Sequence, residues 1–166
     1  MEKITLRAPE PDDIGLIYIW ENSTDERHSS LRSGPLSRHS IERFVNEYDG
    51  EIYTLGALRY MIDLEGETVG TVDIFDFDHH ARHAFVGIYV ASAYRRKGIA
   101  LTALKKVEEL MRTNVSMHSL GALVATDNKP SLALFEKAGY RSVGILEGWI
   151  ADGEERIPAI IWQHIL

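Results

Sequence analysis

The sequence predicts an α+β fold of mixed α/β type, in which about four helices flank a mainly antiparallel sheet of six to seven strands. Three observations lead to this fold class. Apolar residues recur at three- and four-residue steps in four separate segments, which is the spacing of amphipathic helices. Three segments in the middle of the chain have the composition and length of strands, and two further ones flank a tight turn near the C-terminus.

The first third of the chain predicts one short strand and two helices. "KITLRA" alternates as a strand does, and "PEPDDIGLIYIWEN" follows it with a proline and two acidic residues where a helix N-terminus prefers them. Residues 22–36 are polar and show no period, so we expect a loop or an irregular region there. Ser37 then suits the N-cap of a second helix.

The middle of the chain changes from a helical to a strand-like pattern. Leu55 to Leu64, Thr68 to Phe77 and Ala84 to Val90 predict three strands of an antiparallel meander. After a basic turn, the apolar spacing from Ala100 to Met111 predicts an amphipathic helix. "LGALVAT" is apolar throughout, which is typical of a central strand that is covered on both faces.

The last third of the chain predicts a helix and a hairpin. Asn128 suits an N-cap, Pro130 the first helical turn, and Gly139 the position at which the helix ends. The order strand, helix, strand, helix predicts a parallel strand pair in this part of the sheet. Asp152–Gly153 lies between two strand-like segments and suits the tight turn of a hairpin.

Composition limits the classes of function. With 166 residues, of which 45% are hydrophobic, the chain has material for one core, so we expect a single domain over residues 1–166. The formal net charge of −7 argues against nucleic acid as the main partner and favours cationic or neutral ones. Without cysteine there is no disulfide or thiolate chemistry, which is typical of a reducing compartment. No apolar run has the length of a membrane span, so we expect a cytoplasmic protein without membrane partners.

A cationic turn, "YRRKGIA", lies between the end of a predicted strand and the start of a predicted helix. Backbone N–H groups at a helix N-terminus have no partner within the helix, and the helix dipole adds positive charge there. Gly98 allows a ligand to approach the backbone, and three consecutive cations precede it. The turn therefore predicts a site for a pyrophosphate, with a basic surface turn as the alternative.

Two motifs together identify a family. "YRRKGIALTALKKVEEL" resembles the pyrophosphate loop and following helix of the GNAT superfamily of N-acetyltransferases, with Arg95, Gly98 and Ala100 in the motif positions. "DNKPSLALFEKAGY" resembles the family's later Asn-containing helix. The resemblance covers nearly the whole chain, and it is greatest to bacterial spermidine acetyltransferases and ribosomal-protein N-terminal acetyltransferases.

This resemblance implies transfer of an acetyl group from acetyl-CoA to a primary amine in a ternary complex, without a covalent enzyme intermediate. It also implies a sheet that is splayed near the motif loop, so that acetyl-CoA and the amine meet from opposite faces. By the same resemblance, the residues that bind acetyl-CoA are Ile88, Tyr89, Val90, Arg95, Arg96, Lys97, Gly98, Ile99, Ala100, Asn128 and Ser131.

The catalytic positions depart from the family pattern. Spermidine acetyltransferases carry a Tyr as the acid where this chain has Phe135, and many relatives carry a Glu where it has Phe85. His83 lies two residues before Phe85 and so should face the same side of its strand. Asp73 lies at a commonly acidic position of the preceding strand. His83 and Asp73 are therefore the candidate catalytic residues.

Acidic residues near the meander are candidates for recognition of a cationic amine. Asp73, Asp76 and Asp78 can form an acidic rim, although a solvated, charged strand end is the alternative. The segment "SSLRSGPLSRHS" carries none of the acids that the spermidine enzymes have there, which weakens polyamine recognition. The histidines at 79, 80 and 83 lack a complete ligand spacing, so we expect no metal site. Trp149 and Trp162 are expected to cover the core or an interface.

Three functions remain open at this point. The first is acetylation of a small polycationic amine, which the acidic balance and the meander favour. The second is acetylation of a protein N-terminus or another amine, which the missing acidic segment favours. The third is a catalytically weak domain that binds acetyl-CoA, which Phe85 and Phe135 favour. The sequence leaves open whether the chain forms a homo-oligomer.

Overall fold

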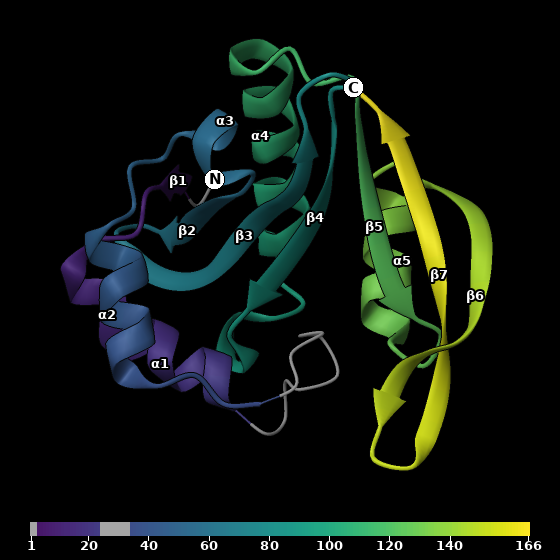
Figure 1. Ribbon diagram of the computed structural model, residues 1–166, viewed down its shortest axis with the longest axis horizontal. Helices are drawn as coiled ribbons and strands as arrows, with labels where there is room; N and C mark the ends of the chain where they lie inside the picture. Colours follow the sequence, from purple (N-terminus) through teal and green to yellow (C-terminus); the bar gives the residue numbers. More distant parts are fainter. Residues whose placement is uncertain (1–2, 24–33) are drawn as a thin grey trace.

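The computed structural model describes residues 3–23 and 34–166, which form one seven-stranded sheet in the order β1-β2-β3-β4-β5-β7-β6 (Figure 1). Neighbouring strands are antiparallel except for β4 and β5, which are parallel. The predicted fold class and the predicted parallel pair are confirmed. The strands are β1 (Ile4–Arg7), β2 (Leu58–Leu64), β3 (Glu67–Asp78), β4 (His83–Val90), β5 (Ser119–Ala125), β6 (Arg141–Asp152) and β7 (Glu155–Ile165).

The described residues contain five α-helices and two short 3₁₀ helices, where the sequence predicts about four helices. None of these helices combines the length and the apolarity needed to cross a membrane. Most of the predicted loop at residues 22–36 lies outside the described residues. The helices are η1 (Pro11–Asp13), α1 (Ile14–Asn22), α2 (Arg38–Asn46), α3 (Ile52–Leu55), η3 (Ser92–Tyr94), α4 (Ile99–Asn114) and α5 (Lys129–Lys137).

Helix α3 corrects one predicted boundary. The sequence predicts a strand from Leu55, but Leu55 ends α3 and β2 begins at Leu58. The Glu51 side chain accepts a hydrogen bond from the Tyr53 N–H and so caps the helix start. Gly56 then adopts the left-handed conformation, at φ 67°, and stops the helix after one turn. Such a short helix has too few residues to show a helical period.

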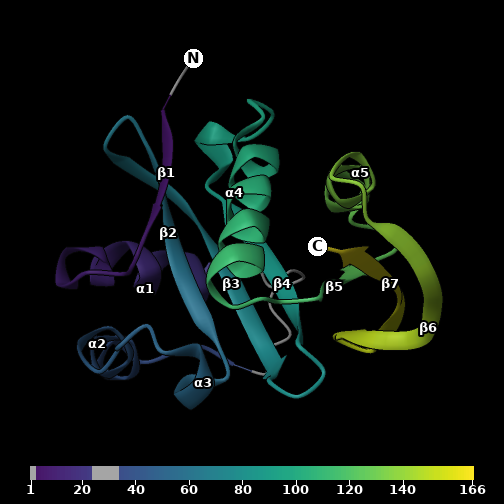
Figure 2. The same cartoon turned by 90° about the horizontal axis from the view of Figure 1, so that it is seen from above.

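The helices cover both faces of the sheet. Figure 2 shows α1 and α2 on one face of the β1–β4 half and α4 on the other face. Ile17 of α1 and Ile41 of α2 pack on Met61 of β2, as expected from their spacing. On the other face, Leu104 and Val107 of α4 belong to the main core. Ser37 caps α2 as predicted, because its hydroxyl accepts a hydrogen bond from the Ser40 N–H.

The sheet is splayed between β4 and β5, as predicted (Figure 1). The two strands pair only from His83 to Phe85 on β4, opposite Ser119 to Gly121 on β5. The Phe85 ring lies where a side chain at 121 would be: a Cβ there would come within 3.0 Å of the ring. The glycine therefore admits Phe85 at the apex of the splay, and beyond this point the two arms of the sheet separate.

The C-terminal hairpin extends the second arm of the sheet. Asp152 and Glu155 pair across the predicted turn, where Gly153 has a φ of 59°. Strand β6 forms the edge of the sheet, and its register shifts between Leu146 and Ile150. This bulge changes the direction in which the β6 side chains near the splay point.

Candidate active site

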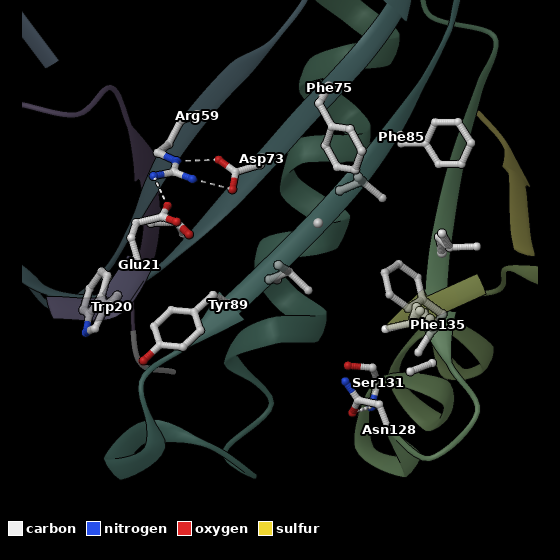
Figure 3. Close-up of a pocket in the computed structure, with 18 of the residues that line it drawn as sticks. Trp20, Glu21, Arg59, Asp73, Phe75, Phe85, Tyr89, Asn128, Ser131 and Phe135 are labelled. Carbon is white, nitrogen blue, oxygen red and sulfur yellow. Dashed lines mark hydrogen bonds and ion pairs between the residues drawn. The ribbon is translucent and has the colours of Figure 1, made fainter. Parts of the chain in front are cut away.

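A cleft of about 590 Å³ lies in the splay, between β4 on one arm and β5 with α5 on the other. Helix α1 and strand β3 extend its first wall, and β6 contributes to the second wall. Figure 3 shows the two walls, with Tyr89 on the first and Phe135 on the second. A concave site with apolar walls and a few polar groups is the usual form of a small-molecule site.

Strand β4 lines the cleft from Phe85 to Tyr89. Phe85, Gly87 and Tyr89 share one face of the strand, whereas Val86 and Val90 contribute their side chains to the core on the other face. Opposite them on β3, the register pairs Gly87 with Asp73. Because residue 87 has no side chain, the floor of the cleft is open above the middle of β4.

The backbone of β4 has an open edge along the cleft. The Ala91 N–H donates to the Val69 carbonyl of β3, so the backbone groups of Tyr89 also face β3. By alternation, the N–H and C=O groups of Ile88 point away from β3, toward the side where β5 has separated. This edge can pair with an extended amide-containing ligand, as an added strand would.

The cationic turn connects β4 to α4 at one end of the cleft. Gly98 adopts the left-handed conformation, at φ 80°, and directly precedes the first residue of α4. The side chains of Arg96 and Lys97 are exposed, and a Cβ at Gly98 would meet no atom within 4 Å. The start of a 16-residue helix, whose first N–H groups have no partner within the helix, together with these cations is an arrangement that can bind an anion.

Contacts from neighbouring elements hold this turn in place. The Arg95 Nε donates to the Val90 carbonyl at 2.8 Å, and its guanidinium lies 5.7 Å from the centre of the Tyr89 ring. The Tyr94 hydroxyl donates to Glu67, a hydrogen bond that raises the pKa of Tyr94. Arg95 therefore acts partly as a brace between the turn and β4.

Helix α5 brings three residues of one face to the second wall. Asn128 caps the helix as predicted, since its Oδ1 accepts from the Ser131 N–H at 3.2 Å. Asn128, Ser131 and Phe135 follow at three- and four-residue spacing, and all three line the cleft (Figure 3).

The first wall carries a buried ion network that joins three elements. Arg59 of β2 donates to both carboxylate oxygens of Asp73, at 2.6 and 2.8 Å, and its Nη1 lies 2.6 Å from Glu21 of α1 (Figure 3). The Arg59 side chain is 12% exposed. Its burial alone would lower the pKa of Arg59, but the attraction of Asp73 and Glu21 outweighs burial and raises it. All three residues border the cleft.

Comparison with known proteins identifies the family. Residues 3–141 match the family model described as "Acetyltransferase (GNAT) domain". The chain belongs to the GNAT acetyltransferases. Over 97% of its length it is 26% identical to the spermidine N(1)-acetyltransferase of Escherichia coli K12, of which the match covers 87%. A stretch of 70 residues, 42% of each protein, is 39% identical to the N-alpha-acetyltransferase of Saccharolobus solfataricus.

Solved structures have the same fold. The spermidine N-acetyltransferase of Vibrio cholerae, in complex with CoA and spermine, superposes with a TM-score of 0.89 at 20% identity, over 98% of this chain and 95% of that one. A dodecameric structure of the same enzyme has a TM-score of 0.83 at 21% identity, over 98% of this chain and 93% of that one. The chain is thus an N-acetyltransferase that uses acetyl-CoA as the acetyl donor.

The two phenylalanines at the usual acid and base positions of GNAT enzymes form part of the cleft walls. The Phe85 ring stacks on Phe75 at 6.0 Å between ring centres. Phe135 is 4% exposed and packs edge-on against Tyr140 at 5.0 Å. Neither ring can donate or accept a proton.

The other predicted polar residues fall in different places. Asp76 is exposed, lines the cleft and has a φ of 53° beside a register shift of β3. Asp78 lies outside the cleft lining and accepts hydrogen bonds from the N–H groups of His80 and Ala81, which lower the pKa of Asp78. His83 pairs with Asp78 in the register and also lies outside the lining. The structure therefore brings Asp73 and Asp76 together at the cleft and separates them from His83.

The described part of the chain contains no set of side chains that could bind a metal ion. No group of three or more His, Asp or Glu side chains gathers there in a way that could hold an ion. His79 and His80 instead lie against each other, with 3.9 Å between their ring centres.

Trp149 and Trp162 have different surroundings, although the sequence suggests the same role for both. Trp162 is 8% exposed and belongs to the core, as expected. Trp149 is 56% exposed and lines the cleft, so it does not cover the core. Gly148, at φ 58° within the β6 bulge, precedes it and turns the strand. The bulge depends on pairing with β7, so the residue pattern of β6 alone did not predict that Trp149 lies at the cleft.

Proposed function

We propose that this GNAT enzyme acetylates a primary amine of a small, cationic, polyamine-like molecule. One observation carries the proposal: among the described residues, the charged ones that line the cleft are three carboxylates and one guanidinium, namely those of Glu21, Asp73, Asp76 and Arg59. A surplus of carboxylates at a partly apolar cleft attracts an alkylammonium. The activity of the spermidine N(1)-acetyltransferase of Escherichia coli, which matches almost the whole chain, agrees with this substrate class.

The residues at the donor end of the cleft have the charges and hydrogen-bonding groups that acetyl-CoA requires. The exposed cations and the N–H groups at the start of α4 would hold the pyrophosphate, and the Ile88 carbonyl at the open edge of β4 would accept a hydrogen bond from an amide of pantetheine. Asn128 and Ser131 face the same path from the second wall. Bound there, acetyl-CoA supplies an activated thioester, and the chain supplies its position.

The acceptor amine has to be neutral when it attacks. Phe85 and Phe135 carry no titrating group, so we assign the removal of the amine proton to water at the mouth of the cleft. Asp73 is assigned to attraction of the amine, because Arg59 holds both of its oxygens. The backbone N–H of Ile88 would stabilise the oxyanion as it forms.

A thiol-release assay with acetyl-CoA tests this function. The panel contains spermidine, spermine, short diamines, amino acids and peptides, and acetyl-CoA binding is measured in parallel. We expect turnover of the polyamines and diamines. Asp76→Asn should raise KM for a diamine about fivefold, whereas Asp12→Asn, an exposed acid far from the cleft lining, should leave it unchanged. Turnover of peptides alone would replace the proposed substrate class with protein N-termini, and binding without turnover would replace it with an acetyl-CoA sensor.

Homo-oligomer formation is part of the same proposal. It is supported by the dodecameric structure of the Vibrio cholerae enzyme, which shares the fold. Sedimentation of the purified chain would test it, and a monomer at all concentrations would contradict it.

A further inference from the structure

A second cavity, of about 540 Å³, lies on the same face of the sheet as the cleft, between strands β2 and β3 and the helices α1, α2 and α3. None of the roles assigned above uses it. Phe44 and Leu55 line it and are 40% and 45% exposed, so the cavity has an apolar rim that reaches solvent. Its lining consists of Ile17, Leu36, Ser40, Ile41, Phe44, Tyr48, Leu55, Ala57, Leu58, Arg59, Asp73, Ile74 and Phe75. This cavity is called the distal pocket below.

The polar groups that border the distal pocket already have partners. The Tyr48 hydroxyl donates to the Arg59 carbonyl and accepts from the Arg59 N–H, both at 3.0 Å. The Ser40 hydroxyl lies 2.8 Å from that of Ser37, and the Arg59 guanidinium is bound to Asp73. A guest with its own polar groups would lose water without gaining a hydrogen bond, whereas a hydrocarbon group would lose nothing.

The distal pocket lies next to the cleft and shares wall residues with it. Ile17, Arg59, Asp73 and Phe75 line both cavities. Figure 3 shows Arg59, Asp73 and Phe75 along one wall of the cleft. The Phe75 ring lines the distal pocket and also stacks on Phe85 at the apex of the splay, where the two arms meet.

Charge distinguishes the two cavities. The cleft contains the carboxylates of Glu21 and Asp76, which the distal pocket lacks. Among the described residues, the charged ones that line the distal pocket are Arg59 and Asp73, and these are paired with each other. A second ammonium placed there would lie close to a guanidinium and find no unshared carboxylate.

We propose that the distal pocket receives the uncharged hydrocarbon end of the acceptor. The acceptor is then an amphipathic amine: its nitrogen atoms lie in the acidic cleft, and an alkyl chain or an aromatic ring at the far end occupies the pocket. This proposal rests on the proposed function, because it assumes that the cleft acetylates a primary amine. It narrows the substrate class from any small cationic amine to one with a hydrocarbon end.

Acetyl transfer to a series of linear alkylamines tests the proposal. The wild-type chain is assayed by thiol release with n-propylamine, n-pentylamine, n-heptylamine and n-nonylamine at saturating acetyl-CoA. Burial of one methylene group is worth about fourfold in affinity, so kcat/KM should rise about fourfold per added methylene until the pocket is filled. A kcat/KM that stays flat or falls along the series would overturn the proposal.

Two substitutions that fill the pocket keep the test informative if one of them fails to fold. Ser40→Leu on α2 and Ala57→Leu before β2 add bulk from different sides of the pocket. Each should reduce the ratio of kcat/KM for n-heptylamine to that for n-propylamine by at least tenfold. His39→Leu is the matched control, because His39 is the exposed neighbour of Ser40 on α2 and lies outside the lining. It should leave the ratio unchanged.

The outcomes separate this inference from the proposed function. Equal turnover of all the alkylamines, with no effect of either filling substitution, would overturn the inference and leave amine acetylation in place. Thiol release with no amine of any kind would overturn the proposed function and the inference together. A ratio that falls to the same extent in His39→Leu as in Ser40→Leu would also overturn the inference, since filling would not be the cause.

Discussion

The two ends of the cleft are built in opposite ways. The donor end consists of residues that follow one another along the chain: the turn from Arg95 to Gly98 is exposed and joins one strand to the next helix. The acceptor end consists of Glu21, Arg59 and Asp73, which come from a helix and two strands and meet in a buried ion network. A local motif can change without disturbing the core, whereas the network supports both recognition and packing.

Removal of the cation from the buried network should have the largest effect on stability. Arg59→Met leaves Asp73 and Glu21 partly buried without their partner, which should lower the free energy of unfolding by about 3–5 kcal/mol. Urea denaturation at neutral pH measures this. A matched surface change, Arg38→Met, removes an exposed pair with Glu42 and should cost less than about 1 kcal/mol. Equal effects of the two substitutions would contradict the contrast between the two ends.

Disruption of the donor turn should abolish binding while leaving the fold intact. Arg95→Ala removes a positive charge and the hydrogen bond from Arg95 to the Val90 carbonyl. Gly98→Asp places a carboxylate at the helix N-terminus, at a residue whose φ is 80°. The two substitutions are combined in one variant. We expect the dissociation constant for acetyl-CoA to rise about a hundredfold or more. Calorimetric titration measures it. Unchanged affinity would remove the assignment of the pyrophosphate loop.

A second ion network, which lies outside the cleft lining, predicts a dependence of stability on pH. Arg7 donates to both oxygens of Asp13, at 2.7 and 2.9 Å, and the Glu10 N–H donates at 2.7 Å. Burial would raise the pKa of Asp13, but these hydrogen bonds outweigh it and lower the pKa. A lowered pKa in the folded state stabilises the fold above the ordinary carboxyl range, and this stabilisation is lost as pH falls through that range.

Asp13→Asn should therefore lower the free energy of unfolding by about 2–3 kcal/mol at pH 7, and the difference from the wild type should shrink as pH falls below about 4. Urea denaturation from pH 3 to pH 7 follows the difference. The contribution of the charged hydrogen bonds would be refuted by a difference that is constant over this range.

The apex between the two arms predicts a smaller effect. Gly121→Ala places a Cβ 3.0 Å from the Phe85 ring, so the ring has to move and the free energy of unfolding should fall by about 1–2 kcal/mol. Gly87→Ala is the control on the neighbouring strand, because its Cβ would lie 3.6 Å from Phe75, an ordinary contact. Thermal unfolding of the two variants compares them, and an equal loss in both would show that Phe85 does not depend on the glycine.

Local patterns were sufficient for two helix caps and one turn. The N-caps Ser37 and Asn128 and the turn at Gly153 were predicted because each depends on residues within three or four positions in the chain. The predicted start of a strand at Leu55 was wrong because Leu55 ends a one-turn helix, which is shorter than the period that would reveal it.

The acceptor end was predicted only in part. Asp73 and Asp76 were expected at an acidic rim, and both border the cleft. Arg59 and Glu21 were missed, although a cation within an otherwise apolar predicted strand was a signal that a buried partner existed. That partner is Asp73, which pairs with Arg59 across the β2–β3 register. Trp149 was expected to cover the core or an interface; the structure places it at the cleft and outside the core, because the bulge that turns β6 arises from its pairing with β7.

The sequence by itself determined the order of the strands and of the four longer helices, the GNAT motif turn and the caps at Ser37 and Asn128, because each is fixed by hydrogen bonds and periodicities within a few residues. Only the tertiary structure decided which charges neutralise one another, which aromatic rings close the splay and where a second cavity opens beside the first. These features depend on residues that are far apart in the chain. Their contacts form only when the strands pair in the native register and the helices pack on the sheet.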